Sequence, residues 1–262
     1  MRRDYFKLYF KYMNVNIKGI MIYDLDYILG IVAMAIKCAV NFCMLLLLFE
    51  LTDNINGWTF EQMLFLYGMS TFSYALWHCL FIDIITIPTY IQSGEFDRFL
   101  LKPLSPLFQI MMETFDEDGW GELIFGFAIL TISLVKLDFN NIYILLIPLF
   151  CLSGCLIFAA ISILSSSVAF YTVGNIDLTD NVMDFKEFAK YPLSIFGPVI
   201  RIVFTVIIPI GFIAYYPGML FMDDSYRWGI IPFLSLPVSI VFMVFASWWW
   251  HRSLRKYDSS GH

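Results

Sequence analysis

The sequence predicts an all-α membrane protein with six transmembrane helices. Hydrophobic residues make up 60% of the 262-residue chain, only 15% of the residues are charged, and the mean hydropathy is +0.74. Soluble domains contain roughly 45–50% apolar and about 25% charged residues, so this chain has too few charges to coat a water-facing surface. Its many aromatic residues are atypical of a disordered chain. A soluble globular enzyme is therefore not expected, and a disordered chain is excluded.

Six stretches are long and apolar enough to cross a membrane, since a transmembrane helix needs about 20 mostly apolar residues. Strands of a β-barrel would alternate polar and apolar residues, and these stretches do not. The fourth and fifth stretches are long enough to tilt, kink or include interfacial turns. Within a single domain, 1–262, the predicted spans are residues 27–49, 62–84, 119–135, 142–172, 195–221 and 229–250.

The basic residues predict the orientation of these spans. Twelve of the sixteen fall in the amino-terminal segment, the second and fourth loops and the carboxyl-terminal segment, whereas the opposite side has only Lys136 and Arg227. Basic loop residues are retained on the cytoplasmic side. We therefore expect a multi-pass plasma-membrane protein with both termini in the cytoplasm. The twelve residues are Arg2, Arg3, Lys7, Lys11, Lys18, Arg98, Lys102, Lys186, Lys190, Arg252, Arg255 and Lys256.

The segment before the first span predicts an interfacial helix over residues 4–24. Lys7, Lys11, Asn14 and Lys18 recur at helical spacing, and the other faces are largely apolar. Such a helix lies on the inner leaflet with its charges toward water. An ordinary juxtamembrane basic patch explains the same residues, and both interpretations can hold. No uninterrupted apolar run precedes Tyr27, so a cleavable signal peptide is not expected.

The first inner loop, residues 88–118, predicts a short rigid helix. Gly94 permits a turn, residues 95–101 can form about two helical turns, and Pro103 and Pro106 stop them. A compact element of this kind suits docking into a groove of a cytoplasmic partner. An interfacial loop without a partner fits the pattern equally well. The charged residues are Glu95, Asp97, Arg98 and Lys102, and the apolar residues are Phe96, Phe99, Leu100 and Leu101.

The fourth loop predicts a second amphipathic helix on the inner side. Asp177 or Thr179 can cap its start, and Tyr191-Pro192 ends it before the fifth span. We expect it to pack on the membrane surface or against the first inner loop. Its apolar positions at helical spacing are Leu178, Val182, Phe185 and Phe188.

Motifs for catalysis and cofactor binding are absent from the sequence. There is no HExxH, no GxSxG and no Gly-Lys step, so a zinc protease, a nucleophile elbow and a P-loop are excluded. His78 and Asp83 are five residues apart and lie on different helical faces. The net charge of −6 offers no basic field for nucleic acid. We predict no catalytic, cofactor-binding or metal residues; the five cysteines, all in apolar runs, are expected to be buried thiols.

Candidate transport residues lie inside the spans. Lys37 is about 15 Å into the first span by helical rise, with Asn41 one turn further on. A charge at this depth is costly and indicates function. Three roles stay open for Lys37: it lines a transport path, pairs with an acid from another helix, or snorkels inward. Pro209 interrupts the fifth span, which favours a moving helix, although proline kinks also occur in static bundles. Arg201 lies near enough to the inner surface to snorkel.

One segment resembles a known family. The run YIQSGEFDRFLLKPLSPLFQ (Tyr90–Gln109) is similar to the cytoplasmic loop of permease subunits in the type-2 (ABC-2) family of ATP-binding-cassette exporters. Residues 57–68, 190–218 and 255–261 are similar in the same order, so the resemblance covers most of the chain. The stretch FDEDGWGE (Phe115–Glu122) is more acidic than is usual for the family.

The resemblance implies a half-transporter that is not itself an enzyme. Such a permease dimerises, with an identical or paralogous chain, over two cytoplasmic ATPase subunits that bind ATP and Mg²⁺. The cargo implied is hydrophobic or amphiphilic, such as a drug, a lipid or a peptide-like molecule. The resemblance makes Lys7–Lys18 the interfacial helix and residues 95–102 the coupling helix, with Glu95, Phe96, Asp97, Arg98, Phe99 and Lys102 as its coupling residues.

Two other functions stay open on the residues alone. An ion-coupled secondary carrier or channel would use Lys37 and Asn41 in its path. An intramembrane enzyme would need a reactive pair, and none is evident around His78. Co-migration of an ATPase with the purified chain separates the first alternative from an ATP-driven exporter.

Overall fold

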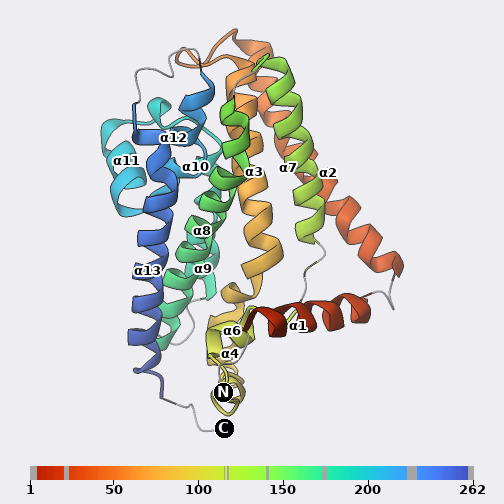
Figure 1. Cartoon of the computed structure of the whole chain (residues 1–262), viewed down its shortest axis with the longest axis vertical. Helices are drawn as coiled ribbons and strands as arrows, with labels where there is room; N and C mark the ends of the chain where they lie inside the picture. The colour runs from red at the N-terminus through yellow and green to blue at the C-terminus, as the bar shows by residue number, and fades with distance from the viewer. Residues whose placement is uncertain are drawn as a thin grey trace.

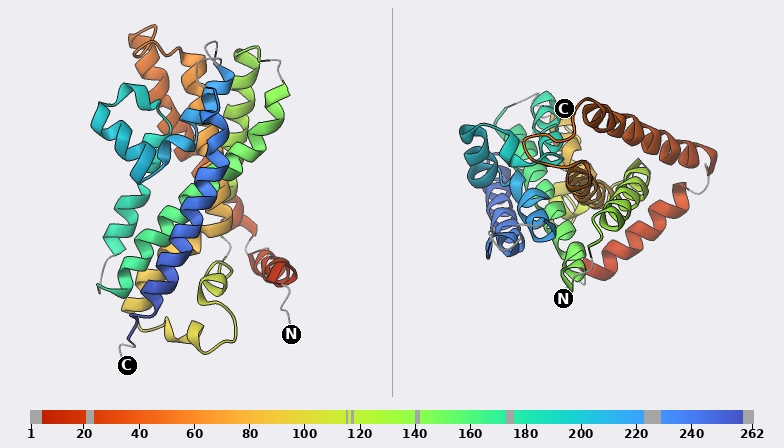
Figure 2. Two further views of the ribbon diagram at one scale, coloured as in Figure 1. Left: turned by 60° about the vertical axis from the view of Figure 1, so that its left-hand side comes forward. Right: turned by 90° about the horizontal axis from the view of Figure 1, so that it is seen from above.

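The computed structural model is an α-helical bundle in which five long helices stand side by side (Figures 1 and 2). It describes residues 5–20, 24–114, 116, 118–139, 142–172, 176–222 and 229–258. The lower end of the bundle in Figure 1 carries residues 87–114, and the upper end carries the turn Ile55–Trp58. The long helices are α2 (Asp24–Leu51), α3 (Phe60–Phe81), α7 (Asp118–Lys136), α8 (Ile147–Ser166) and α13 (Ser235–Leu254).

These helices confirm five of the six predicted spans. Each is long and apolar enough to cross a membrane once its flanking turns are included. The sequence marks the start of α3, where the Thr59 side chain accepts a hydrogen bond from the Gln62 backbone N–H and the Gln62 side chain accepts one from Thr59. This reciprocal pair satisfies two backbone donors that a helix start leaves open. The flanking turns are η1 (Ile82–Thr86) with α4 (Ile87–Gln92), η2 (Ile142–Leu146), η3 (Ser167–Phe170) and η9 (Ile231–Leu234).

Small residues allow a close contact between α3 and α7. A Cβ atom on Gly68 would lie 2.7 Å from the backbone nitrogen of Leu130, and one on Gly126 would lie 2.8 Å from that of Phe72. Only glycine lets the two backbones approach this closely, as in other membrane helix pairs. Helix α8 occupies the centre, where Ser162 accepts a 3.2 Å hydrogen bond from the Trp77 indole N–H of α3.

The chain returns from the lower to the upper end through α9 (Ile176–Met183) and α10 (Lys186–Ala189). Tyr171, just before α9, packs against Trp249 near the lower end of α13, with ring centroids 6.0 Å apart. At the upper end, Ser194 accepts hydrogen bonds from the side chains of Asn56 (3.1 Å) and Trp58 (2.8 Å). The prediction of a fourth loop on the inner side is therefore wrong, because residues 176–194 rise along the bundle.

Charge explains why hydropathy missed this ascending segment. Lys186 and Lys190 make the segment too polar for a span when each residue is weighed alone. In the structure, the Lys186 ammonium donates a 3.0 Å hydrogen bond to the Tyr74 hydroxyl, and Lys190 forms an ion pair with Glu187 at 2.8 Å. Neither lysine belongs to an inner loop, so both leave the count of inner basic residues. Thr179 is buried within α9 and does not cap it.

The predicted fifth span is a bent pair of helical segments, Pro198–Ile207 and Ile210–Phe221, at 74° to each other. The pair starts beside Ser194 at the upper end and finishes there too, where the ring of Phe221 lies 4.7 Å from that of Phe139. It therefore enters from the upper end and returns to it. The predicted interruption at Pro209 is present: Ile208 is extended, and proline cannot continue the backbone ladder. The pair comprises α11 (Pro198–Ile202), η5 (Val203–Ile207), η6 (Ile210–Phe212), α12 (Tyr215–Gly218) and η7 (Met219–Phe221).

At the lower end, α1 (Tyr5–Ile20) lies across the bundle, nearly at right angles to the long helices (Figure 1). Lys7, Lys11 and Lys18 are exposed along it. A 3.1 Å hydrogen bond from the Asn16 side chain to the Met112 carbonyl connects the helix to the bundle. Burial raises the pKa of the Tyr9 phenol. The predicted helical conformation of this segment is confirmed, and its position on the inner leaflet stays a prediction.

Candidate functional site

Residues 95–102 form a short, tightly held element at the lower end. Gly94, with φ +75°, adopts the left-handed conformation that turns the chain away from α4. The helical part, α5 (Asp97–Leu100), is a single turn and so is shorter than the two turns expected. Buried Gln109, in α6 (Pro106–Ile110), closes the loop by donating to the carbonyls of Phe99 (2.8 Å) and Leu104 (3.0 Å).

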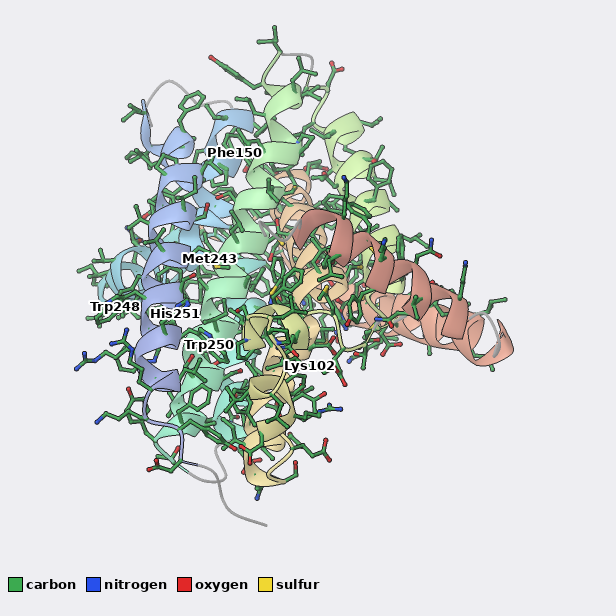
Figure 3. The ribbon with its side chains drawn as sticks, turned by 60° about the horizontal axis from the view of Figure 1, so that its bottom comes forward. Lys102, Phe150, Met243, Trp248, Trp250 and His251 are labelled. Carbon is green, nitrogen blue, oxygen red and sulfur yellow. The ribbon has the colours of Figure 1, made fainter. Side chains whose placement is uncertain are left out.

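The two phenylalanines of this element point inward. Phe96 and Phe99 are fully buried, and the Phe96 ring lies 5.2 Å from Phe170 and 4.9 Å from Tyr257. The expectation that they face a partner is corrected: they anchor the element to η3 and to the end of α13. Figure 3 labels Lys102 on this element and Trp250 and His251 on α13. The apolar residues of this element fall on two faces. The sequence alone does not decide which of the two faces packs against the bundle.

Two charged residues of the element, Arg98 and Asp97, also contact the rest of the protein. Arg98 forms a 2.8 Å ion pair with Glu113, and its guanidinium lies 4.7 Å from the centre of the Phe99 ring. Asp97 accepts a 2.8 Å hydrogen bond from the Tyr257 hydroxyl. Burial and this hydrogen bond raise the pKa of Tyr257 to about 12. Arg98 and Asp97 therefore hold the element in place.

The remaining residues form what we call the docking face: Glu95, Leu100, Leu101 and Lys102. All four are exposed, and the exposed fraction of Leu101 is 87%. An exposed leucine pair between charges of opposite sign is suited to binding a protein surface. Of the six predicted coupling residues, only Glu95 and Lys102 belong to this face.

A buried histidine joins the lower-end loop to the spans. His78 of α3 hydrogen-bonds through Nδ1 to Glu122 of α7 at 2.9 Å and through Nε2 to Asp116 at 3.1 Å. The hydrogen bond with His78 holds the pKa of Asp116 below its usual value. Nearby, Asp83 accepts hydrogen bonds from both the backbone N–H (2.9 Å) and the hydroxyl of Thr114.

Sequence reasoning missed these partners because they lie far along the chain. It did not favour a His78–Asp83 pair, and in the structure each residue has other partners. The one available signal was the unusually acidic stretch Phe115–Glu122, which supplies Asp116 and Glu122. Both ring nitrogens of His78 are engaged with carboxylates, so the cluster acts as a structural link. No group of three metal-ligating side chains occurs within the described ranges.

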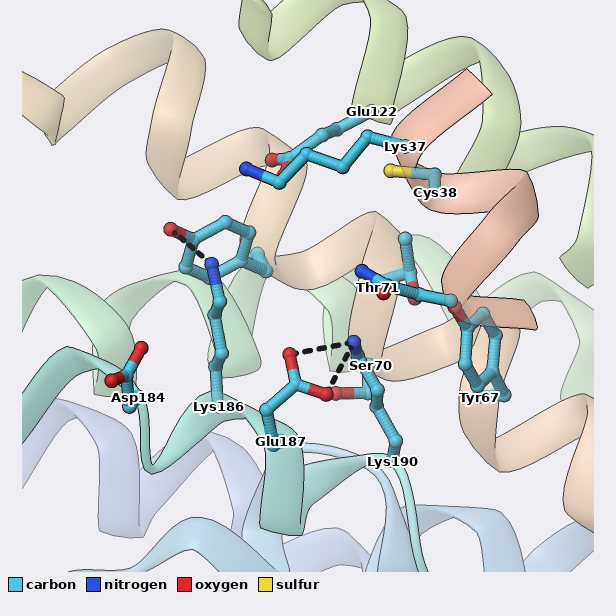
Figure 4. A pocket seen from close by; sticks show the side chains of 12 residues that line it. Lys37, Cys38, Tyr67, Ser70, Thr71, Glu122, Asp184, Lys186, Glu187 and Lys190 are labelled. Carbon is cyan, nitrogen blue, oxygen red and sulfur yellow. Dashed lines mark hydrogen bonds and ion pairs between the residues drawn. The ribbon is translucent and has the colours of Figure 1, made fainter. Parts of the chain in front are cut away.

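A polar cavity of about 230 Å³ lies at mid-height between α2, α3, α7 and the ascending segment (Figure 4). Lys37 and Asn41, predicted to line a transport path, both face it. Lys37 is near the middle of α2, consistent with the depth expected from the sequence. Its other lining residues are Cys38, Tyr67, Ser70, Thr71, Tyr74, Glu122, Asp184, Lys186, Glu187 and Lys190.

Pro209, the third predicted path residue, lies elsewhere. It borders an apolar groove of about 670 Å³ between the bent pair and α13, together with Phe212 and Phe242. The structure therefore separates Pro209 from Lys37 and Asn41. Arg201 is exposed and donates a 3.2 Å hydrogen bond to the Ser194 carbonyl, which places it toward the upper end and not at the inner surface.

A bundle of helices that are long and apolar enough to cross a membrane defines an integral membrane protein. Residues 35–261 match the family described as ABC-2 family transporter protein. The chain belongs to that family and is a membrane permease of an ABC transporter, which implies an ABC ATPase as partner. Separate comparisons with curated proteins and with solved structures found no match. The family match replaces the hypothesis of an ion-coupled carrier or channel.

Proposed function

We propose that the chain is the permease subunit of an ATP-driven exporter in the plasma membrane, with its lower end in the cytoplasm. In this proposal the docking face binds a cytoplasmic ATPase that carries ATP and Mg²⁺. Two permeases, identical or paralogous, work over two ATPase subunits. The observation that carries the proposal is the construction of residues 95–102, which are fixed to several helices on one side and exposed on the other.

Charge supports a cytoplasmic lower end. Its exposed basic residues include Lys102, Arg252, Arg255 and Lys256, whereas the upper end of the described chain carries Lys136 and Arg201. Because basic residues favour the cytoplasmic side, this imbalance is in the expected direction even without Lys186 and Lys190. Acidic residues near the upper end, Glu50, Asp53, Glu61 and Asp138, agree with it.

Movement of the docking face would reach the spans by two routes. The first passes through Phe96 and Phe99, which pack against Phe170 and the end of α13. The second passes through Arg98 and Glu113 to the loop that His78 and Asp83 tie to α3 and α7. A push on one exposed turn is therefore delivered to four spans, because packed interiors transmit displacement.

The cavity around Lys37 and Asn41 is the proposed cargo site. Charged groups at mid-height in a membrane protein are rare and mark transport paths. The bent pair beside Pro209 is a candidate moving element, since interrupted helices are common where transporters open. An amphiphilic cargo suits a polar cavity surrounded by apolar helix surfaces.

The test is coupled ATP hydrolysis in the purified complex. The full chain is purified from its native membranes, and Mg²⁺-dependent ATP hydrolysis is measured with the wild type, Lys102→Glu and Glu95→Arg. We expect an ATPase to co-purify, and both variants to insert normally and lose most of the associated activity. Arg255→Glu, an exposed basic residue outside the docking face, serves as the control. Absence of ATP hydrolysis with the wild type, or full activity in both variants, would refute the proposal.

A further inference from the structure

The cavity contains two lysines, Lys37 and Lys186, that form no ion pair among the described residues. Lys190 is paired with Glu187, and Glu122 is hydrogen-bonded to His78. Lys186 donates to the Tyr74 hydroxyl and lies 4.1 Å from the centre of that ring. Within the described part of the chain, neither Lys37 nor Lys186 forms an ion pair. Asp184 is the one lining acid that is likewise not ion-paired among these residues.

The lining has three lysines and three carboxylates, but Lys37 and Lys186 face the space without an ion pair to any of these carboxylates. Lys37 and Lys186 reach into it from different walls (Figure 4). Two ammonium groups facing one space repel each other, and their charges are costly at mid-height in a membrane. A singly charged anion between them would relieve both effects.

Size and surroundings define the rest of the ligand. Pockets for whole drug-sized molecules have volumes of about 300–1,000 Å³, so a cavity of about 230 Å³ holds a headgroup and little more. On α2, the residues next to Lys37 and Asn41 form an exposed apolar surface of Ile36, Val40 and Met44. An alkyl chain attached to the headgroup can lie along that surface.

We propose that the cavity binds the singly charged anionic headgroup of an amphiphile, a carboxylate or a phosphate ester, between Lys37 and Lys186. This inference rests on the proposed function and names the chemical class of its cargo. The ammonium groups donate charge-assisted hydrogen bonds to the headgroup oxygens. Asn41, whose side chain also lines the cavity, supplies a neutral donor.

Equilibrium binding to the full chain in phosphatidylcholine nanodiscs tests the proposal. The probes are palmitate, palmitoyl lysophosphatidylglycerol and the uncharged monopalmitoylglycerol, which share one alkyl chain. We expect saturable binding of palmitate, the lysophospholipid or both, and the probe that binds distinguishes a carboxylate from a phosphate cargo. Lys37→Gln and Lys186→Gln should each raise Kd about tenfold or more, the effect of losing one charge-assisted hydrogen bond.

Two control variants make the result specific. Lys136→Gln removes an upper-end cation outside the cavity and should leave Kd unchanged, whereas Lys37→Arg keeps the charge and should retain binding. Equal affinity for the uncharged probe, or wild-type Kd values in both glutamine variants, would overturn the proposal. Associated ATP hydrolysis is measured in the same preparations. If hydrolysis persists while anion binding is absent, the cargo inference fails and the exporter proposal stands.

Discussion

The hydroxyl of Tyr257 donates a 2.8 Å hydrogen bond to the carboxylate of Asp97. It joins the segment after the last span to the element that carries the docking face. The same tyrosine packs against Phe96 with ring centroids 4.9 Å apart. Tyr257 therefore holds the element against the segment after α13 through both a polar and an aromatic contact.

Removal of the Tyr257 hydroxyl should weaken coupling without preventing insertion. In Tyr257→Phe the aromatic contact remains and one hydrogen bond to a charged group is lost, a change of about 1.5–3 kcal/mol. We expect less transport per ATP hydrolysed. Tyr171→Phe, another phenol near the end of α13, is the control. An unchanged transport-to-hydrolysis ratio in Tyr257→Phe would contradict this role.

The Tyr257 contact should also be insensitive to pH over the working range. Its pKa is raised to about 12, so its contribution to stability is present below the unfolded value of about 10 and is lost as the pH rises through 12. Between pH 6 and 9, the difference in thermal stability between wild type and Tyr257→Phe should stay constant. A difference that disappears within that range would show that another group controls the contact.

Phe99 and Leu101 should respond differently to truncation. Phe99 is fully buried, so Phe99→Ala leaves a cavity and costs about 3–5 kcal/mol. We expect a lower melting temperature in detergent and poor recovery from membranes. Leu101→Ala removes an exposed side chain and should leave the melting temperature unchanged while weakening ATPase binding. Equal melting temperatures for the two variants would disprove the inward orientation of Phe99.

The Asp116–His78 contact should stabilise the protein in a pH-dependent way. The pKa of Asp116 is lowered, so its contribution is present above the unfolded value of about 3.9 and is lost as the pH falls through the lower folded value. Asp116→Asn should lower the melting temperature at pH 7, and the deficit should shrink under acidic conditions below pH 4. Asp138→Asn, an exposed carboxylate at a positive φ that asparagine tolerates, should show neither effect. A deficit independent of pH would exclude an ionic contribution.

Labelling from the two sides of the membrane tests the ascending segment. In a cysteine-free chain, Gly197→Cys and Asn54→Cys should react from the upper side, and Lys102→Cys from the lower. Gly197 is exposed, and a Cβ atom there meets no neighbour within 4 Å, so the substitution is tolerated. The hydropathy pattern puts residue 197 at the inner surface, beside residue 102. Labelling of residues 197 and 102 from the same side of the membrane would support the topology expected from hydropathy.

Hydropathy was sufficient for α2, α3, α7, α8 and α13 because a crossing helix must be apolar along its length. It failed for residues 176–194, whose lysines are satisfied by Tyr74 and Glu187, contacts that a residue-by-residue scale ignores. It also assigned residues 195–221 to a crossing span. An apolar composition shows that a segment lies in the membrane, but it does not show whether the segment leaves on the side from which it entered.

The candidate site was only partly predictable for related reasons. Lys37 and Asn41 stood out because a polar pair in an apolar run is conspicuous. Their neighbours Lys186 and Glu122 come from segments brought together by folding alone. For residues 95–102, the sequence showed which side chains are charged and which are apolar. It did not show which of them face the bundle, because burial of Phe96 depends on Phe170 and Tyr257.

The contact that holds the docking face also forms late in the synthesis of the chain. Asp97 and Tyr257 are 160 positions apart, so the ribosome completes the rest of the bundle before this contact can form. Until then Phe96 lacks one of its packing partners, and the docking face is held less firmly against the bundle. Under the proposed function, a chain synthesised without Tyr257 would therefore hold its docking face less firmly and couple less well to the ATPase.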